Sequence, residues 1–235
     1  ITQSAAAYCL TKLFHALDAF AAASPSLKSQ IGKSFLFSLY GTLVEPSNAP
    51  SAIGAVIASS LGLSYARMEL MNTLLENSMR NKQILLSVKG SEKELVKKLY
   101  RCGDGNFQLL LIEMLWRLTI PQRKTENDRI AAAAVCFQVV THSHVRTQLI
   151  QHFLAISASK NFGDCIRQFM LKFNELRPTI STTRTKLIHS FHAESVVLND
   201  FRYPDEGSQK PKPVWIDLGT HAITTRLPDP QNETF

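Results

Sequence analysis

Residues 104–121, DGNFQLLLIEMLWRLTIP, decide the fold class of this chain. Leu109, Ile112 and Trp116 recur three and four positions apart, which is the spacing of one helix face. Asn106 can open the helix, and Pro121 stands beyond its end. The stretch therefore predicts a helix that buries an apolar side against the rest of the protein.

The same helical period runs outward from this stretch, from Ser4 to about Leu176. Prolines, glycines and serines interrupt it, so we expect about eight helices joined by short loops. Ser26 can cap the second helix, and Ser91 with Glu94 has the spacing of a capping box. Besides the helix near residues 106–120, helices are expected near 4–24, 26–45, 53–61, 64–88, 91–103, 128–140, 145–156 and 161–176.

Pairs of these helices recur at roughly 40 residues. That spacing is typical of an armadillo- or HEAT-like stack, in which each helix pair buries its apolar face against the next pair. The chain shows no clear sequence self-similarity that would identify true repeats. We predict a mainly α protein whose residues 1–178 form an armadillo-like α-solenoid.

The pattern changes after Pro178. Residues 186–198 carry short apolar runs in a Thr-rich region, which favours strands. Residues 214–227 alternate around the turn Gly219-Thr220 and predict a β-hairpin. Because an isolated hairpin is marginal in water, it needs partners from the helices or from further strands. We assign residues 179–235 to a β-rich segment and expect it to be the truncated start of a second domain.

The composition bounds the class of protein. The 235 residues are 45% hydrophobic and 19% charged, which is enough apolar surface to bury a core and excludes a disordered chain. No stretch reaches the roughly 18 to 20 apolar residues of a bilayer span, so we expect no membrane partner. The four cysteines form no C-x-x-C pair, which favours free thiols in the cytosol or nucleus. The net charge of +7 favours acidic partners mildly.

The chain offers little catalytic chemistry. Gly32-Lys33-Ser34 matches the end of a P-loop, but Leu27 stands where that loop needs a glycine. One group of residues has zinc-ligand chemistry, although its spacing does not fit a zinc site and its cysteine lies in an apolar run. That group is Cys136, His142, His144 and His152. We predict a protein that is not an enzyme and holds no metal or cofactor.

Two sets of residues are candidates for binding. Four basic residues lie on the helix expected near residues 91–103, three of them at every fourth position, as on a phosphate-binding surface. They are Lys93, Lys97, Lys98 and Arg101. An ordinary solvated helix face has the same pattern, and no aromatic residues are interleaved, so DNA is the lesser alternative as a partner. Trp116 and Trp215 are candidate structural or interface anchors, because each indole can bury a large apolar surface.

Three blocks of this sequence resemble, in the same order, the N-terminal region of the synaptonemal complex protein 2 family. The first runs from Asp104 to Arg123 and includes the helix quoted above. The second, Asn161 to Arg167, is similar to that family's Asp-Cys-Arg helix start. The third, Val214 to Thr220, is similar to its Trp-Ile-Asp strand at the entrance of the second domain. The chain departs from the family in being shorter between Thr125 and Lys160.

The resemblance implies an armadillo-like domain followed by a pleckstrin-homology-like domain, in the lateral elements of meiotic chromosome axes in the nucleus. The predicted function is then a non-enzymatic structural module that recruits chromosome-axis or chromatin proteins, such as cohesin, centromere or histone proteins. The alternative is a generic armadillo-like adaptor that binds peptides or nucleic acid through the basic face. The family implies no catalytic residues, and the sequence leaves the oligomeric state open.

Overall fold

A computed structural model describes most of the chain. The described residues are 3–44, 61–120, 125–157, 161–177, 188–193, 196–198, 201–203, 214–219 and 223–226. Of the short helix expected near residues 53–61, only Leu61 lies among them, and there it opens the next helix. Over the described residues the protein is mainly helical with a small β-sheet region, as the sequence predicts.

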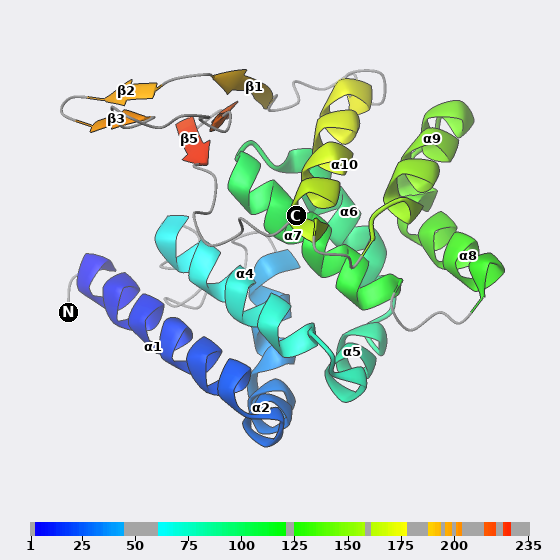
Figure 1. The fold of residues 1–235 in the computed structure, drawn as a ribbon. Coiled ribbons are helices and arrows are strands. Elements are labelled where there is room, and N and C mark those ends of the chain that lie inside the picture. The colour runs from blue at the N-terminus through cyan, green and yellow to red at the C-terminus, as the bar shows by residue number, and fades with distance from the viewer. Residues whose placement is uncertain are drawn as a thin grey trace.

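The helical elements follow the predicted order, except that the single helix expected near residues 64–88 is two helices, because the chain turns at Asn77 and Ser78 (Figure 1). They are α1 (Gln3–Ala23), α2 (Pro25–Val44), α4 (Leu61–Leu75), α5 (Met79–Leu86), α6 (Ser91–Arg101), α7 (Gly105–Thr119), α8 (Glu126–Cys136), η1 (Phe137–Val139), α9 (Ser143–Leu154) and α10 (Phe162–Leu176). Helix α1 packs on α4, α4 on α7, and α7 on α10, while α8 and α9 form a pair beside α10. None of the described helices has the length and apolar character needed to cross a membrane.

Helix α7 lies at the centre of this arrangement and packs against α4, α6 and α10. The sequence predicted one apolar side, but the helix is buried on nearly all sides. Its four partly exposed residues form a single stripe, Asn106, Leu110, Glu113 and Arg117. The polar residues Gln108 and Thr119 are also buried. The Gln108 amide donates to Asn174 of α10, and the Thr119 hydroxyl donates to the carbonyl of Leu115 within α7.

Aromatic side chains fill the core between η1, α9 and α10. Phe153 lies between Phe137 and Phe169, with ring centroids 5.3 and 5.4 Å away. Phe173 extends the group to Tyr100 of α6, at 4.8 Å. Such tilted and edge-on pairs stabilise a core beyond the burial of apolar area alone. This cluster fixes α10, which carries part of the candidate site.

Helix starts differ from the predicted caps in two places. The capping box of Ser91 and Glu94 is wrong, because Gly90, at φ 79°, precedes the helix and Ser91 is its first helical residue. Its hydroxyl donates to Glu92 instead. At α2 the hydroxyl of Ser24, not that of Ser26, accepts the N–H of Leu27 at 3.4 Å. In both helices the residue at the N-terminal cap differs from the predicted one.

Gly32 serves helix packing, which accounts for the glycine in the rejected P-loop match. A Cβ built on Gly32 would overlap the side chain of Asn81 from α5. Asn81 cannot move away easily, because its amide donates to the carbonyls of Lys28 at 3.2 Å and Leu74 at 2.8 Å. The close approach of α2 and α5 therefore requires glycine at this position.

Replacing Gly32 with alanine should destabilise the protein by about 1–3 kcal/mol, the usual cost of overpacking a core. Gly41 in the same helix is the matched control, because its added Cβ meets nothing within 4 Å. Gly41→Ala should stabilise by about 0.4–1 kcal/mol through the unfolded state. Urea unfolding of both variants checks the pair. Equal effects at the two positions would contradict the packing role of Gly32.

The strands form two small antiparallel sheets. They are β1 (His189–Ala193), β2 (Val196–Leu198), β3 (Phe201–Tyr203), β4 (Val214–Leu218) and β5 (Ile223–Arg226). One sheet has the order β1-β4-β5, and the other pairs β2 with β3. The predicted hairpin is confirmed, because β4 pairs with β5 and Ile216 lies opposite Thr225. Strand β1 supplies the partner that this hairpin needed, on the other edge of β4.

Candidate functional site

The sheet is attached to the helices by a buried ion pair between Arg167 of α10 and Asp217 of β4. Nη1 of Arg167 lies 3.1 and 3.2 Å from the two carboxylate oxygens, and Nη2 lies 3.2 Å from Oδ2. The two side chains are only 4% and 1% exposed. Such forked, charge-assisted bonds are strong and fix the direction of both groups. The pair therefore positions the central strand of the sheet against α10.

Trp215 completes the same contact. Because side chains alternate along a strand, Trp215 and Asp217 lie on one face of β4. The Arg167 guanidinium lies 5.0 Å from the centre of the indole, in cation–π range. Trp215 therefore contacts α10 from β4, at the place where the sheet meets the helices. Its role as a structural or interface anchor stays a prediction.

Gly105 brings the start of α7 to the same point. A Cβ added at Gly105 would lie 2.9 Å from the Cβ of Asp217, closer than such atoms approach. The start of α7 can therefore lie this close to β4 only because Gly105 has no side chain. Gly105, Arg167 and Asp217 come from the three separate sequence blocks described above, and the structure brings them together.

Asp104, next to Gly105, links α7 to α4. Its Oδ1 accepts the N–H of Phe107 at 2.8 Å, which caps α7, and the hydroxyl of Tyr65 at 2.6 Å. Burial, followed by the hydrogen bond to Asp104, raises the pKa of the Tyr65 hydroxyl well above its ordinary value. Tyr65 is therefore a donor rather than an acid at any physiological pH.

Arg177 and Cys102 extend this buried polar group toward α6. The guanidinium of Arg177 donates to the carbonyl of Cys102 at 2.9 Å, and the Cys102 thiol donates to the carbonyl of Asp104 at 3.2 Å. Burial raises the pKa of the Cys102 thiol to about 11. These bonds hold the turn between α6 and α7 in place.

The cysteines should differ sharply in reactivity, because only a thiolate attacks alkylating reagents. Cys9 is exposed and Cys102 and Cys136 are buried. Iodoacetamide at pH 8 should label Cys9 in the folded protein and the two buried thiols only after denaturation. Peptide mass spectrometry of a time course measures this. Labelling of Cys102 as fast as Cys9 in the native protein would contradict its burial and its raised pKa.

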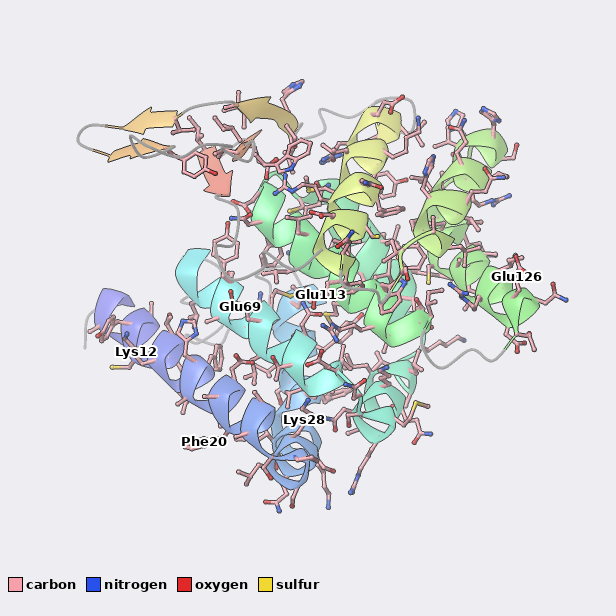
Figure 2. The ribbon with its side chains drawn as sticks, in the orientation of Figure 1. Lys12, Phe20, Lys28, Glu69, Glu113 and Glu126 are labelled. Carbon is pink, nitrogen blue, oxygen red and sulfur yellow. The ribbon has the colours of Figure 1, made fainter. Side chains whose placement is uncertain are left out.

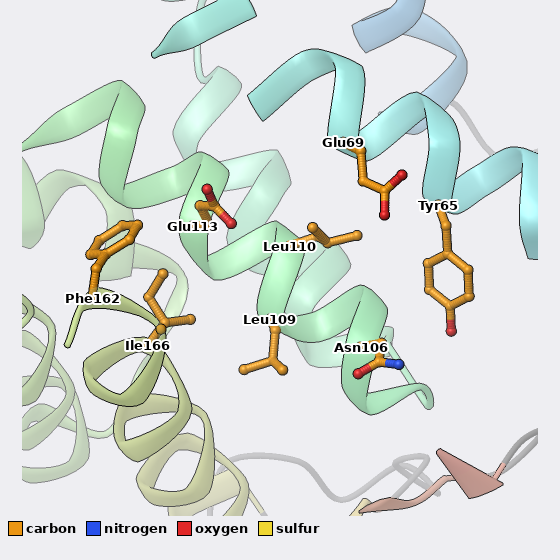
Figure 3. Close-up of a pocket in the computed structure, with 9 residues that line it drawn as sticks. Tyr65, Glu69, Asn106, Leu109, Leu110, Glu113, Phe162 and Ile166 are labelled. Atoms are coloured by element: carbon orange, nitrogen blue, oxygen red, sulfur yellow. The ribbon is translucent and has the colours of Figure 1, made fainter. Parts of the chain in front are cut away.

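A pocket of about 390 Å³ opens between α4, α7 and α10 (Figure 3). Two glutamates face it from neighbouring helices, Glu69 on α4 and Glu113 on α7 (Figure 2). Apolar side chains form much of the rest of its lining, namely Leu109, Leu110, Phe162 and Ile166. The pocket therefore combines two carboxylates with an apolar wall.

The predicted basic face lies on α6. Lys97 and Arg101 are exposed, and Lys93 and Lys98 are partly exposed. Nζ of Lys97 lies 2.6 Å from Glu94 of the same helix, so part of the positive charge is neutralised there. Glu92 adds a second carboxylate to the first turn of α6. Whether the basic face binds a partner stays a prediction.

Trp116 of α7 is buried. Its indole N–H donates to the carbonyl of Ile156 at 3.2 Å, and its ring lies 4.8 Å from that of Phe162. These contacts tie α7 to the chain leading into α10. Trp116 thus occupies a core position, in the role of a structural rather than an exposed anchor.

The Cys/His group weighed for zinc is not brought together as a metal site. Cys136 is buried in the core, while His142, His144 and His152 are exposed. Across the part of the chain that the structure describes, no three His, Cys, Asp or Glu side chains gather around a point where an ion could bind.

Neither the Arg167–Asp217 ion pair nor the pocket was predicted from the sequence. The sequence nevertheless contains a signal for the ion pair. Arg167 lies within the buried stripe of α10 that also holds Ile166 and Phe169. Asp217 lies in the apolar strand 214–218. A charged residue at a core position of each of two elements is a sign of a buried pair, because lone buried charges are too costly.

Comparison with known proteins gives one informative result. The chain is similar to a solved structure of a synaptonemal complex protein, with a TM-score of 0.60 and 18% identity. The match covers 93% of this chain and 51% of that one, so this chain spans about half the length of its structural neighbour. No protein-family model and no curated protein sequence matches. The chain therefore has a fold like that of part of a synaptonemal complex protein.

Proposed function

We propose that this chain is a non-enzymatic interaction module of a meiotic chromosome-axis protein, in the lateral elements of the synaptonemal complex. The observation that carries the proposal is the junction of Gly105, Arg167 and Asp217. Its three residues belong to the three blocks that resemble the synaptonemal complex protein 2 family. The contact of these residues in the fold supports reading the three blocks together. The similarity in fold to a synaptonemal complex protein supports the same assignment.

The proposed architecture has two parts. Residues 1–178 form an armadillo-like α-solenoid, supported by the succession of α1, α4, α7 and α10, in which each helix packs on the next. Residues 179–235 form the first strands of a pleckstrin-homology-like domain, supported by the antiparallel sheet β1-β4-β5. The Arg167–Asp217 pair would hold the two parts in one orientation, so that they present a continuous surface to partners.

The charged groups of the junction serve the fold rather than a reaction. Arg167 and Asp217 satisfy each other, and Asp104 is occupied by Tyr65 and by the start of α7. An interaction module needs no more than such a rigid frame. The partners proposed for it are chromosome-axis or chromatin proteins in the nucleus, including cohesin, centromere and histone proteins.

The assignment is tested by localisation in meiotic cells. The protein, tagged and expressed in spermatocytes or oocytes, should mark chromosome axes in prophase spreads. A second line carrying Asp217→Ala, in which the frame is loosened, should mark them weakly at equal protein level. An even nuclear or cytoplasmic signal for the unaltered protein would overturn the proposal. Affinity purification from meiotic nuclear extract then identifies the axis or chromatin partner.

A second candidate function is an adaptor that binds nucleic acid through the basic face. The exposed Lys97 and Arg101 on one side of α6 favour it, and the Glu94 ion pair weakens it. Phosphate contacts make affinity fall steeply with salt. A DNA affinity that falls steeply between 50 and 200 mM salt, and that is lost when all four basic residues of the face become glutamate, would favour the adaptor. A flat salt response would favour protein partners.

A further inference from the structure

We infer that the pocket between α4, α7 and α10 binds a short segment of a partner protein that carries a lysine or arginine beside an apolar residue. The cationic side chain would meet Glu69 and Glu113, and the apolar side chain would lie on the wall formed by Leu109, Phe162 and Ile166. The inference rests on the proposed function, since it gives the interaction module a binding site and a class of partner.

The position of the pocket singles it out. Three of the four residues in the partly exposed stripe of α7 line the pocket, namely Asn106, Leu110 and Glu113. Its volume of about 390 Å³ lies near the lower end of the range for ligand sites. That space admits a few side chains and is too small for a folded domain. A short extended or helical segment of a partner is the occupant of matching size.

The charge of the pocket selects a cation. Glu69 has a half-exposed side chain, and Nδ1 of His15 lies 4.0 Å from its Oε2. Glu113 accepts from Arg117 through Oε1 at 2.8 Å, and Arg117 is shared with Glu76. Among the described residues, Oε2 of Glu113 and both oxygens of Glu69 receive no hydrogen bond. These oxygens are free to bind a lysine or arginine, which prefers carboxylate partners.

The apolar wall gives the second half of the specificity. Leu109 and Ile166 are almost fully buried in the wall, and the Phe162 ring lies at its edge beside Arg117. An apolar side chain of the partner would remove the remaining exposed part of this wall from water. The hydroxyl of Tyr65 is already donated to Asp104, so it adds no competing donor. A purely basic segment would lack this contact, and a purely apolar one would leave two carboxylates unpaired.

The acidic character of the pocket contrasts with the net charge of the chain. The protein as a whole carries a net charge of +7, so its surface repels basic segments in general. A basic segment would then bind where carboxylates gather, and the apolar wall beside Glu69 and Glu113 favours the pocket over other acidic places. Nucleic acid and acidic proteins would be repelled from the same place. The pocket and the basic face of α6 would therefore serve partners of opposite charge.

A displayed library of random peptides of about 12 residues, selected on the whole 235-residue chain, tests the inference. The expected outcome is enrichment of peptides with a lysine or arginine next to a leucine, methionine or phenylalanine. Synthetic copies should bind in fluorescence anisotropy and bind the Glu69→Gln, Glu113→Gln double variant at least about tenfold more weakly. Enrichment of other peptides, or of none, would overturn the inference.

Two further variants make the result specific to the pocket. Leu110→Trp fills the pocket without a change of charge and should abolish binding. Glu175→Gln makes the same chemical change at an exposed position of α10 and should leave binding unchanged. Thermal melting confirms that each variant is folded. Peptides that bind the Leu110→Trp or the double variant as well as the parent chain would place the binding elsewhere and overturn the inference.

The peptide test is independent of the meiotic assignment. A protein that is absent from chromosome axes and still selects basic–apolar peptides would overturn the proposed function and retain the pocket. A protein on the axes that selects no such peptide would retain the proposed function and overturn the pocket. The two failures are therefore distinguishable.

Discussion

Replacing Asp217 with alanine is expected to lower the free energy of unfolding by about 3–5 kcal/mol. The substitution leaves the guanidinium of Arg167 buried, only 4% exposed, with no carboxylate to balance it. The strand that carries Asp217 is central to its sheet, so β1 and β5 lose their common support. Hydrogen-exchange mass spectrometry should show faster exchange in β4 and α10, and urea unfolding measures the loss of stability.

Two controls separate the lost pair from a general effect of the substitution. Asp164→Ala removes an exposed carboxylate from the first turn of α10, the helix that carries Arg167. This variant should lower the free energy of unfolding by less than about 1 kcal/mol. The double variant Arg167→Met, Asp217→Leu replaces the whole pair with apolar groups and should recover most of the stability. A double variant as unstable as Asp217→Ala would contradict the explanation by an unpaired buried charge.

The succession of helices and the hairpin could be predicted because their signals are local. The helix α7 could be predicted from the spacing of Leu109, Ile112 and Trp116 within it and from the proline at position 121 that follows it in sequence. The helix was nevertheless more buried than one apolar side implies, because burial depends on helices far away in sequence. The start of α6 was missed for a related reason. Ser91 and Glu94 match a capping box, but the left-handed conformation of Gly90 places the turn one residue earlier.

The junction could not be predicted in full, because its partners are far apart in sequence. Arg167 and Asp217 are 50 residues apart, and a sequence pattern gives no distance over such a separation. The resemblance singled out the blocks that contain both residues and Gly105, without indicating that they touch. The pocket left no sequence signal at all. Glu69 and Glu113 look like ordinary surface residues until α4 and α7 are placed side by side.

The structure favours the pocket over the basic face of α6 as a binding site. Four basic residues on one helix attract attention in a sequence, yet α6 carries carboxylates among them. Glu69 and Glu113 are unremarkable in sequence, yet the fold brings them to one pocket with an apolar wall. A binding site depends on which groups converge and what already neutralises them, and both properties arise only on folding.

Asp104→Ala is expected to lower the free energy of unfolding by about 2–4 kcal/mol, as the sum of two losses. The carboxylate caps α7, and loss of a cap costs about 1 kcal/mol. Its removal also leaves the half-buried Tyr65 hydroxyl without its acceptor, which adds about 1–3 kcal/mol. Because α7 is the central helix, a weaker start of α7 should also weaken its contacts with α4 and with β4.

Asp104→Asn is the matched control. Oδ1 alone makes both hydrogen bonds, and Oδ2 is buried without a partner among the described residues. An amide in place of Oδ2 keeps the cap and the Tyr65 bond and exchanges one unpaired buried group for another, so this variant should lose less stability than Asp104→Ala. Tyr65→Phe combined with Asp104→Ala should lose less than the sum of the two single variants, because both remove the same bond. Strictly additive losses, or an Asp104→Asn variant as unstable as Asp104→Ala, would contradict the shared hydrogen bond as the origin of the effect.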